Sequence, residues 1–336
     1  MLKARVPIHL GVLALALLAA ALADCGGSGS QSMLAPASPA GRATRLGQPA
    51  DGLAGPISPA APADFMYVVD NGSETVYQYS YPAPKRLGKI EVPFYDVLTI
   101  CLNTSQEIFV VDNAAQSIRE YSRDGQNVLK TMIDFSGFPL GCSVDPTTGN
   151  VAVTNNQQGT YGQPGNVVIY PHGNPNGKTY SIPNTFFYHF PAYDDKGNLF
   201  VDGHGLRPGP PVLGELPKGA GSFKDLKINV KTASFLGMQW DGKYLAVCDI
   251  GARPNEIDRF SISRSGATKV SSTTLKGDDD VYQFSIAAIG GKTMLIATDP
   301  RNRRVFAWRY PLGGSPAVSI GGFADPLDAV VSLGSK

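Results

Sequence analysis

The chain has 336 residues, of which 43% are hydrophobic and 17% charged, and its formal net charge at pH 7 is +1. Loss of Lys3 and Arg5 with an N-terminal signal would leave it close to neutral, and it has no basic stripe interleaved with aromatic residues. Electrostatics therefore gives no signal of a nucleic-acid-binding protein. With 38 Gly and 26 Pro, the composition favours a globular domain rich in turns.

Residues 1–24 have the features of an export signal peptide. Lys3 and Arg5 precede an apolar run over residues 6–22, which gives a positive n-region followed by a hydrophobic h-region. We therefore expect the mature protein to leave the cytoplasm.

Two signals compete for the position of cleavage. Residues 21–23 (ALA) fit the small-x-small rule of ordinary signal peptidase, whereas residues 22–25 (LADC) resemble a bacterial lipobox, which would place a lipid on Cys25. Asp24 departs from the lipobox pattern, but the Gly- and Ser-rich stretch after Cys25 is typical of a lipoprotein tether. We expect a cell-envelope lipoprotein, with a secreted or periplasmic soluble protein as the alternative. Residues 25–62, rich in Ala, Pro, Ser and Gly, are expected to be a disordered tether.

From residue 63 onward, a hydrophobic pattern recurs six times. Each repeat contains a four-residue β run, and the runs recur at intervals of about 40 to 50 residues, which is the period of a β-propeller blade. The runs are Tyr67–Asp70 (YVVD), Phe109–Asp112 (FVVD), Ala152–Asn155 (AVTN), Phe200–Gly203 (FVDG), Ala246–Asp249 (AVCD) and Ile296–Asp299 (IATD). The sequence predicts one all-β domain over residues 63–336, a six-bladed β-propeller. A β-sandwich is the less favoured alternative, since it does not need six equally spaced copies of one motif.

A second strand follows each β run, marked by an aliphatic residue and a large apolar residue three positions later, such as Val76 and Tyr79. An apolar stretch that ends in a tight turn precedes five of the runs. The first run lacks such a stretch, whereas Leu327–Leu333 (LDAVVSL) has no partner downstream. We expect this C-terminal strand to close the N-terminal blade, because closure removes an exposed sheet edge.

Three cysteines lie within the predicted domain. Cys101 and Cys142 occupy nearly equivalent positions on the first strands of neighbouring blades, so they can meet and form a disulfide in an oxidising compartment. The alternative is that both are small apolar residues, which a one-residue difference in register would point apart. Cys248 lies within a β run and is expected to be buried.

Segments Asp145–Val153 (DPTTGNVAV) and Asp195–Val201 (DKGNLFV) resemble the repeat cores of the six-bladed propellers of the NHL and lactonase-like superfamily. The resemblance covers about residues 64–334 and implies the architecture, which carries binding proteins, lactonases and lyases alike. More narrowly, the chain is similar to bacterial exported propellers, a likeness that brings no activity with it.

Lactonase-like relatives hold a divalent metal with acidic and amide side chains at the strand entrances around the central channel. The corresponding pairs here are residues 96–97 (DV), 139–140 (PL), 190–191 (FP), 235–236 (FL), 283–284 (QF) and 326–327 (PL). This set does not match the metal ligands residue by residue, so no metal or cofactor is predicted.

Loop lengths within the repeats point to a candidate site. The loop after the β run is longer in blades three, four and five than in the others, and loops on a rigid scaffold commonly carry binding residues. The longer loops are residues 155–166 (NNQQGTYGQPGN), 203–211 (GHGLRPGPP) and 249–256 (DIGARPNE). We expect them to cluster on one rim of the propeller.

Five residues of blades three and four are the candidates for ligand binding. His204 lies in the long loop of blade four and His189 in the connection entering that blade, so both are expected on one face, near Arg207 and Tyr161, together with Asp202 of the β run. Imidazole titrates near neutral pH, which suits ligand recognition or acid-base work. The alternative is that the histidines bond only water and backbone, and that the longer loops are inert insertions.

Short acidic or amide residues end five of the β runs, in the order Asp70, Asp112, Asn155, Asp249 and Asp299. A ring of carboxylates suggests a cation site, but each side chain has a local role, because it can cap the turn that follows. Residues 278–280 (DDD) are likewise expected to be a solvated loop. Motifs of serine hydrolases, phosphate-binding loops and CxxC sites are missing from the sequence.

Together these features predict a monomeric exported module for binding or scaffolding, which meets the membrane only through its lipid. Its partner is a protein or a small molecule at the rim of blades three to five, and nucleic acid is not expected. The alternative is a metal-dependent extracytoplasmic hydrolase or lyase of the lactonase-like type.

Overall fold

The computed structural model describes residues 63–91, 93–157, 162–206, 211–230, 235–278 and 280–334. The predicted signal peptide, the tether and Cys25 lie outside the described residues. Residues 61–336 form one compact unit. Within the described part of that unit, the helical elements are two short 3-10 turns, Asn71–Ser73 and Pro171–Gly173. The described helices offer no candidate for a membrane span.

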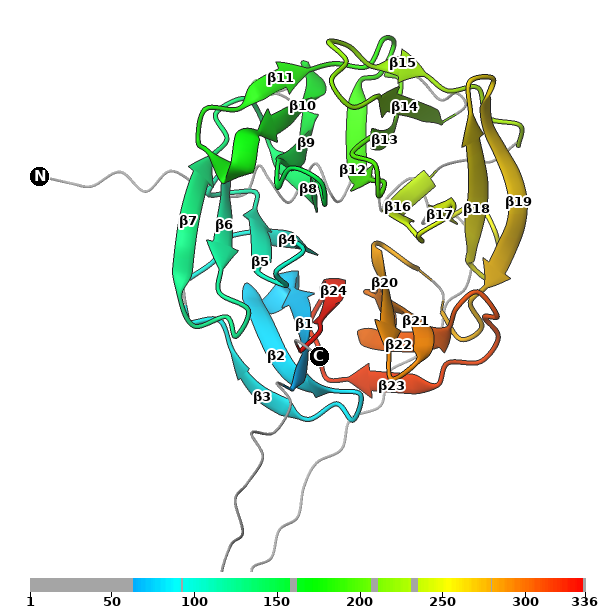
Figure 1. The fold of residues 1–336 in the computed structure, drawn as a ribbon. Helices are drawn as coiled ribbons and strands as arrows, with labels where there is room; N and C mark the ends of the chain where they lie inside the picture. Colours follow the sequence, from blue (N-terminus) through cyan, green and yellow to red (C-terminus); the bar gives the residue numbers. More distant parts are fainter. Residues whose placement is uncertain are drawn as a thin grey trace, which may run out of the picture. The chain divides into compact units, whose positions relative to one another are not determined.

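The chain folds as a six-bladed β-propeller in which each blade is a four-stranded antiparallel sheet (Figure 1). Blade one contains, from the centre outward, β24 (Pro326–Ser332), β1 (Asp64–Asp70), β2 (Thr75–Tyr81) and β3 (Arg86–Lys89). Blade two contains β4 (Val97–Leu102), β5 (Ile108–Asp112), β6 (Ser117–Tyr121) and β7 (Val128–Ile133). Blade three contains β8 (Pro139–Val144), β9 (Val151–Gln157), β10 (Pro164–Tyr170) and β11 (Lys178–Tyr180).

The second half of the ring repeats the same order. Blade four contains β12 (Phe187–Tyr193), β13 (Leu199–His204), β14 (Val212–Leu216) and β15 (Lys224–Asp225). Blade five contains β16 (Phe235–Trp240), β17 (Leu245–Asp249), β18 (Glu256–Ser263) and β19 (Gly266–Thr274). Blade six contains β20 (Phe284–Ile289), β21 (Lys292–Asp299), β22 (Arg304–Arg309) and β23 (Val318–Gly321).

The C-terminal strand closes the ring, as the sequence predicts. Strand β24 pairs antiparallel with β1, with Val330 opposite Tyr67, and Figure 1 shows the red C-terminal strand beside the blue N-terminal one. The Arg123 guanidinium also donates a 2.8 Å hydrogen bond to the Leu333 carbonyl. Because β24 pairs with β1, the edge of β1 that faces the channel is not exposed.

The β runs are buried because successive side chains of a strand point to opposite faces of a blade. In β1, Met66 and Val68 pack against blade six, while Tyr67 and Val69 pack against blade two. Both faces are apolar, so each run reads as a nearly continuous hydrophobic stretch. Burial of each large side chain contributes roughly 1.5–3 kcal/mol. This packing explains why the four-residue runs are the clearest signal in the sequence.

Apolar side chains near the starts of the inner strands fill the central channel at one level. Leu98, Leu140 and Leu327 form a buried cluster against Tyr282, and the Phe190 ring lies 5.6 Å from the Tyr282 ring. Leu140, Phe190 and Leu327 lie within the six strand entrances, and Leu98 directly follows one of them. In this chain these positions are apolar. In this chain the corresponding level of the channel is therefore a hydrophobic barrier, named here the channel plug.

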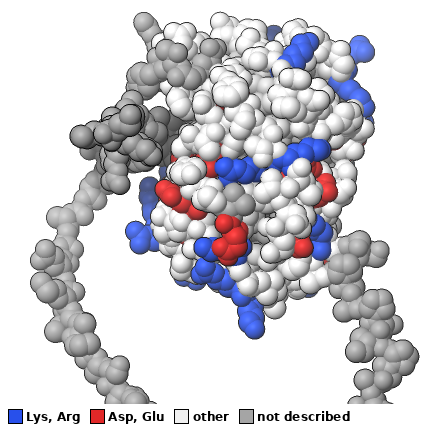
Figure 2. Space-filling view, turned by 90° about the vertical axis from the view of Figure 1, so that its left-hand side faces the viewer, with Lys and Arg blue, Asp and Glu red and all other residues white. Residues whose placement is uncertain are grey.

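Cys101 of β4 and Cys142 of β8 form a disulfide with a Cα–Cα distance of 5.9 Å, which joins blades two and three. The alternative, in which the two side chains point apart, is wrong. Cys248 is a free, fully buried thiol, as expected. Figure 2 shows charged residues of both signs close to one another on one face. Lys130 and Glu120 form one of the ion pairs of the protein, with a 3.2 Å contact.

Candidate functional site

The structure brings His189, Asp202 and His204 together in blade four, but not in the segments that the sequence suggested. His189 lies within the inner strand β12, not in the connection before it, and only 2% of its surface is exposed. His204 is the last residue of β13, not part of a loop. Tyr161 and Arg207 lie outside the described residues, so their expected proximity to the two histidines stays a prediction.

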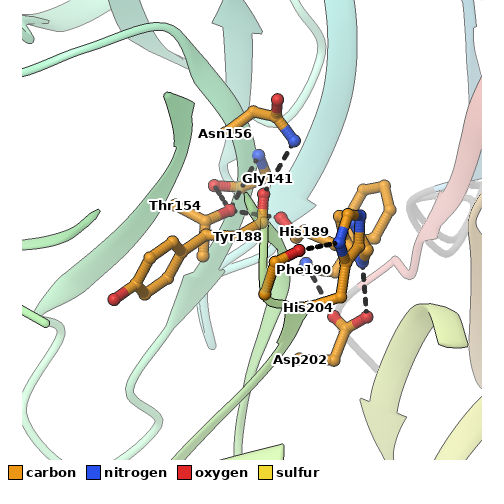
Figure 3. Close-up of polar contacts among 9 residues, drawn as sticks. Gly141, Thr154, Asn156, Tyr188, His189, Phe190, Asp202 and His204 are labelled. Atoms are coloured by element: carbon orange, nitrogen blue, oxygen red, sulfur yellow. Dashed lines mark hydrogen bonds and ion pairs between the residues drawn. The ribbon is translucent and has the colours of Figure 1, made fainter. Parts of the chain in front are cut away.

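Asp202 fixes the start of β12 and one imidazole at the same time (Figure 3). Its Oδ1 accepts a 2.9 Å hydrogen bond from the backbone N–H of Phe190, and its Oδ2 lies 2.9 Å from Nδ1 of His189. A carboxylate beside Nδ1 holds the proton on that nitrogen, because the carboxylate accepts and does not donate. His189 therefore turns its Nε2 away from Asp202.

A β-bulge places His189 against Asp202. Across β12 and β13, Tyr188 is opposite Gly203 and Pro191 is opposite Val201, so two residues of β12 face Asp202 alone. The extra residue bends the inner strand and redirects its side chains. Gly203 is required at this bend, because a Cβ there would lie 2.3 Å from the Phe187 carbonyl oxygen.

The six repeats supply an internal comparison for Asp202. It occupies the third position of its β run, and the side chain at that position is buried in every blade. The six residues at this position are Val69, Val111, Thr154, Asp202, Cys248 and Thr298. Only blade four buries a carboxylate here, and burial of an acid is costly unless it is hydrogen-bonded. The other five blades fold without an acid at this position, so the propeller fold does not by itself require Asp202 and its partner His189.

His204 covers the buried imidazole. The centroids of the His189 and His204 rings are 5.2 Å apart, and the Phe187 ring lies 4.7 Å from His204 on the other strand. His204 Nδ1 lies 2.8 Å from the Gly205 carbonyl oxygen, which can only accept, so this nitrogen carries the proton. Burial lowers the pKa of His204, so the ring is neutral at pH 7.

The two histidines therefore present the same chemical group. In each ring Nδ1 donates to an oxygen of the protein, and Nε2 is the nitrogen left for another partner. Nε2 of His189 is buried and has no hydrogen-bond partner among the described residues. A buried polar atom without a partner is uncommon in native proteins and calls for a specific explanation. A ligand group that donates a hydrogen bond, or a proton to be removed, would satisfy it.

The neighbouring blade also supports the site, which the sequence interpretation missed. Thr154 of β9 donates a hydrogen bond to the backbone carbonyl of His189, and the side-chain amide of Asn156 donates to the Tyr188 carbonyl at 3.2 Å. Figure 3 shows these contacts on the blade-three side of β12. Thr154 occupies the same repeat position as Asp202, and a comparison of the six runs at that position could have indicated both.

Three of the acids that end the other β runs cap the turn that follows, as predicted. Asp112 accepts from the backbone N–H of Ala115, Asp249 from that of Gly251, and Asp299 from that of Asn302. The prediction is wrong for Asp70, which makes no cap bond and instead accepts from the backbone N–H of Asp325. It is also wrong for Asn155, whose side-chain amide donates to Asp134 and Asn166. Within the described ranges, no group of three or more His, Cys, Asp or Glu side chains has the geometry to hold a metal ion.

Comparisons with known proteins extend to the fold. No protein-family model and no curated protein matches the chain. A chain in the crystal structure of a nidogen/laminin complex is similar with a TM-score of 0.63 and 13% identity, over 80% of this chain and 98% of that one. Virginiamycin B lyase from Staphylococcus aureus is similar with a TM-score of 0.52 and 15% identity, over 80% of this chain and 91% of the lyase.

A catalytically inactive variant of the same lyase, solved with quinupristin, gives a TM-score of 0.51 and 13% identity, over 77% of this chain and 80% of the lyase. At these identities the likeness shows a shared six-bladed architecture, which serves a lyase as well as a protein found in a complex. The narrower resemblance to the NHL and lactonase-like superfamily stays a prediction.

Proposed function

We propose that this protein is an extracytoplasmic binding module whose ligand contacts His204 at the rim of blade four and reaches the buried His189 beneath it when the His204 side chain turns aside. The observation that carries the proposal is the buried Asp202, which replaces an apolar, thiol or hydroxyl side chain of the other blades and orients an imidazole with an unpartnered Nε2. The stability of the propeller does not require this pair, since an apolar pair of similar volume would fill the same space.

The chemistry of the two rings indicates the ligand group. Nε2 of the neutral His204 is an acceptor, so it suits a hydroxyl or amide N–H donor of the ligand. Phe187 beside His204 adds an apolar surface. A site of this kind favours a neutral molecule, or a protein side chain, that combines hydrogen-bond donors with apolar area.

Substitution of single histidines tests the proposal. Candidate hydroxyl and amide compounds are screened by saturation-transfer NMR against the wild type and the His189→Asn and His204→Asn variants. His172→Asn is the matched control, because His172 is exposed on the connection between β10 and β11. Compounds that bind the wild type and the control but neither site variant would support the rim site. Equal binding to all four proteins would contradict it.

The second candidate function is acid-base catalysis at the same residues, as in a lyase. The observation that favours it is the geometry of His189 and Asp202, since a carboxylate that holds Nδ1–H leaves Nε2 as a general base. The fold of virginiamycin B lyase adds weight to this candidate. The metal-dependent form of this alternative, a hydrolase or lyase, has no ligand set to support it among the described residues.

Quinupristin, the compound present with the inactive lyase, separates the two candidates. Incubation with the protein is followed by calorimetry for binding and by chromatography for a new product. A product that disappears with His189→Asn would establish catalysis, whereas binding without a product would favour the module. If quinupristin neither binds nor reacts, small hydroxyl compounds and protein partners are tested next in the NMR screen.

Attachment to the cell envelope through Cys25 is the third part of the proposal. The disulfide between Cys101 and Cys142 supports an oxidising compartment. Metabolic labelling with a fatty acid is expected to mark the wild type but not Cys25→Ala. Labelling of neither protein, together with a soluble product, would favour ordinary cleavage after residue 23.

A further inference from the structure

Strand β7 is the outermost strand of blade two, and its outer edge has no partner strand among the described residues. Figure 1 shows it on the outside of the ring. An unpaired edge presents backbone N–H and C=O groups to any extended chain, so proteins usually shorten, charge or cover such edges. The other five outer strands are short or covered, whereas β7 is neither.

Four of the other outer strands, β3, β11, β15 and β23, contain four residues or fewer. Strand β19 is longer, but neighbouring segments cover both ends of its edge. The Ala267 N–H donates to the Lys227 carbonyl, and the Gly314 N–H donates to the Thr274 carbonyl. Strand β7 has six residues, and no segment of the described chain bonds to its outer edge.

The side chains of β7 form an apolar surface. Val128, Leu129 and Ile133 are exposed, and Phe135, in the turn directly after the strand, is 84% exposed. Hydrophobic side chains that are scattered singly over a surface need no explanation, but a group of them marks an interaction site.

The charge of β7 does not protect the edge. Lys130 is the one charged residue of the strand, and its side chain is directed toward blade three. Its Nζ lies 3.2 Å from Glu120 and donates a 3.1 Å hydrogen bond to the His172 carbonyl. A lysine that is held in this way does not repel an approaching strand as a free one would.

The backbone groups of β7 alternate between the two edges of the strand. Directly after β7, the Asp134 N–H donates to the Gln116 carbonyl at 2.8 Å. Met132 and Lys130 lie two and four residues earlier, so their backbone groups also face β6. The groups that point outward belong to Leu129, Thr131 and Ile133.

We propose that β7 pairs antiparallel with β7 of a second copy of this chain, about a two-fold axis through Thr131. This register places Thr131 opposite Thr131 and Leu129 opposite Ile133, so that hydroxyl meets hydroxyl and apolar meets apolar. Lys130 then lies opposite Met132, and no like charges meet. A two-fold interface must be complementary to itself, and this strand meets that condition.

The dimer joins two blades into one continuous sheet, and each Phe135 adds apolar area at one end of the paired strands. A single pair of six-residue strands is a small interface, so the dissociation constant should be roughly micromolar. Composition and charge alone favour a monomer, because they do not reveal an unpaired edge. The dimer uses neither His189 nor His204, so it is independent of the proposed function.

Exchange of charge at the two-fold position tests the proposal. Residues 61–336, which contain the complete closed ring, are studied by sedimentation velocity at increasing micromolar concentration. We expect the wild type to dimerise. Thr131→Lys and Thr131→Glu should each weaken association at least about tenfold, because two like charges meet at the axis. An equal mixture of the two variants should dimerise again. Thr268→Lys, the same change at an exposed residue of β19, should dimerise like the wild type.

A wild type that stays monomeric at high micromolar concentration would overturn the proposal. Unchanged association of the two charge variants, or a mixture that does not associate, would do the same. If the Thr131 variants do not fold, hydrogen exchange of the wild type decides. The amides of Leu129, Thr131 and Ile133 must exchange more slowly as the protein concentration rises, while those of β19 stay constant. Exchange of the β7 amides that is independent of concentration would refute the dimer.

Discussion

Blades two and four have the same topology but bury different kinds of side chain at the place where the second strand pairs with the bulge of the inner strand. In blade two, Val111 is apolar at the third position of its run, and Leu98 at the bulge joins the channel plug. In blade four, the equivalent position holds Asp202, which is bonded to His189. The comparison shows that one blade position accepts either an apolar pair or a mutually satisfied polar pair.

The polar pair requires particular partners, because a buried carboxylate is destabilising when any of its hydrogen bonds is missing. Blade two has moved its acid one residue along, to Asp112, which binds backbone N–H groups of Tyr95, Asp96 and Ala115. Blade four has Gly203 at that place because the backbone of Phe187 leaves no room for a side chain.

The largest expected effect comes from moving the acid into blade two. Val111→Asp buries a carboxyl without a partner, so the free energy of unfolding should fall by about 4 kcal/mol. Urea denaturation measures the change. Val128→Asp on β7 is the control, because Val128 is 46% exposed, and it should change stability by less than about 0.5 kcal/mol. Equal effects of the two substitutions would break the comparison between the blades.

The reverse change in blade four should cost about 3 kcal/mol. Asp202→Val leaves Nδ1 of His189 and the backbone N–H of Phe190 without an acceptor. The double variant His189→Leu/Asp202→Val should recover much of this loss, because it recreates the apolar pair of blade two, yet it should not bind the rim ligand. Denaturation of the single and double variants provides the cycle, and simple additivity would show that the two side chains do not act as a unit.

A buried acid in the connection between blades five and six extends the comparison to pH. The sequence predicted a solvated loop over residues 278–280, which is wrong for Asp278. Asp278 is 2% exposed, one of its oxygens has no partner among the described residues, and burial raises its pKa to about 8. The Asp278 carboxyl is protonated up to about pH 8 in the folded protein but only up to about pH 4 in the unfolded chain. The free energy of unfolding therefore decreases as the pH rises from about 4 to about 8. When the pH is raised from 5 to 8, the free energy of unfolding should decrease by about 2 kcal/mol less in Asp278→Asn than in the wild type. Parallel profiles of stability against pH would contradict this expectation.

The smallest effect concerns two threonines at the same repeat position. Thr154 of blade three donates to the His189 carbonyl, whereas the Thr298 hydroxyl of blade six is buried with no partner among the described residues. Thr154→Val should destabilise the protein by about 1 kcal/mol, and Thr298→Val should be neutral or slightly stabilising. Thermal or urea unfolding of the pair decides whether blade four depends on its neighbour, and equal losses would show that it does not.

Much of the fold could be predicted because each blade repeats a local pattern. The β runs, the second strands and the closing strand β24 all follow from alternating burial and turn residues, which are local properties of the sequence. The disulfide was one of two open alternatives for Cys101 and Cys142, because side-chain direction depends on strand register, and a slip of one residue reverses it.

The candidate site was predicted less well, since it depends on contacts between strands. The sequence located His189 and His204 in blade four but assigned them to connections, because polar residues are usually found in loops. A bulge in β12, opposite Asp202, holds His189 inside a strand. The channel plug was not predicted, since residues from several different blades form it.

The sequence by itself determined the number of blades, the order of their strands and the way the ring closes, because burial on both faces of each blade imposes a repeating apolar pattern. The tertiary structure decided which polar residues meet. Asp202 and His189 are thirteen residues apart and touch only because their strands pair around a bulge, and Asp328 reaches Ile100 only because the ring closes. Such contacts join distant parts of the chain, and no local pattern encodes them.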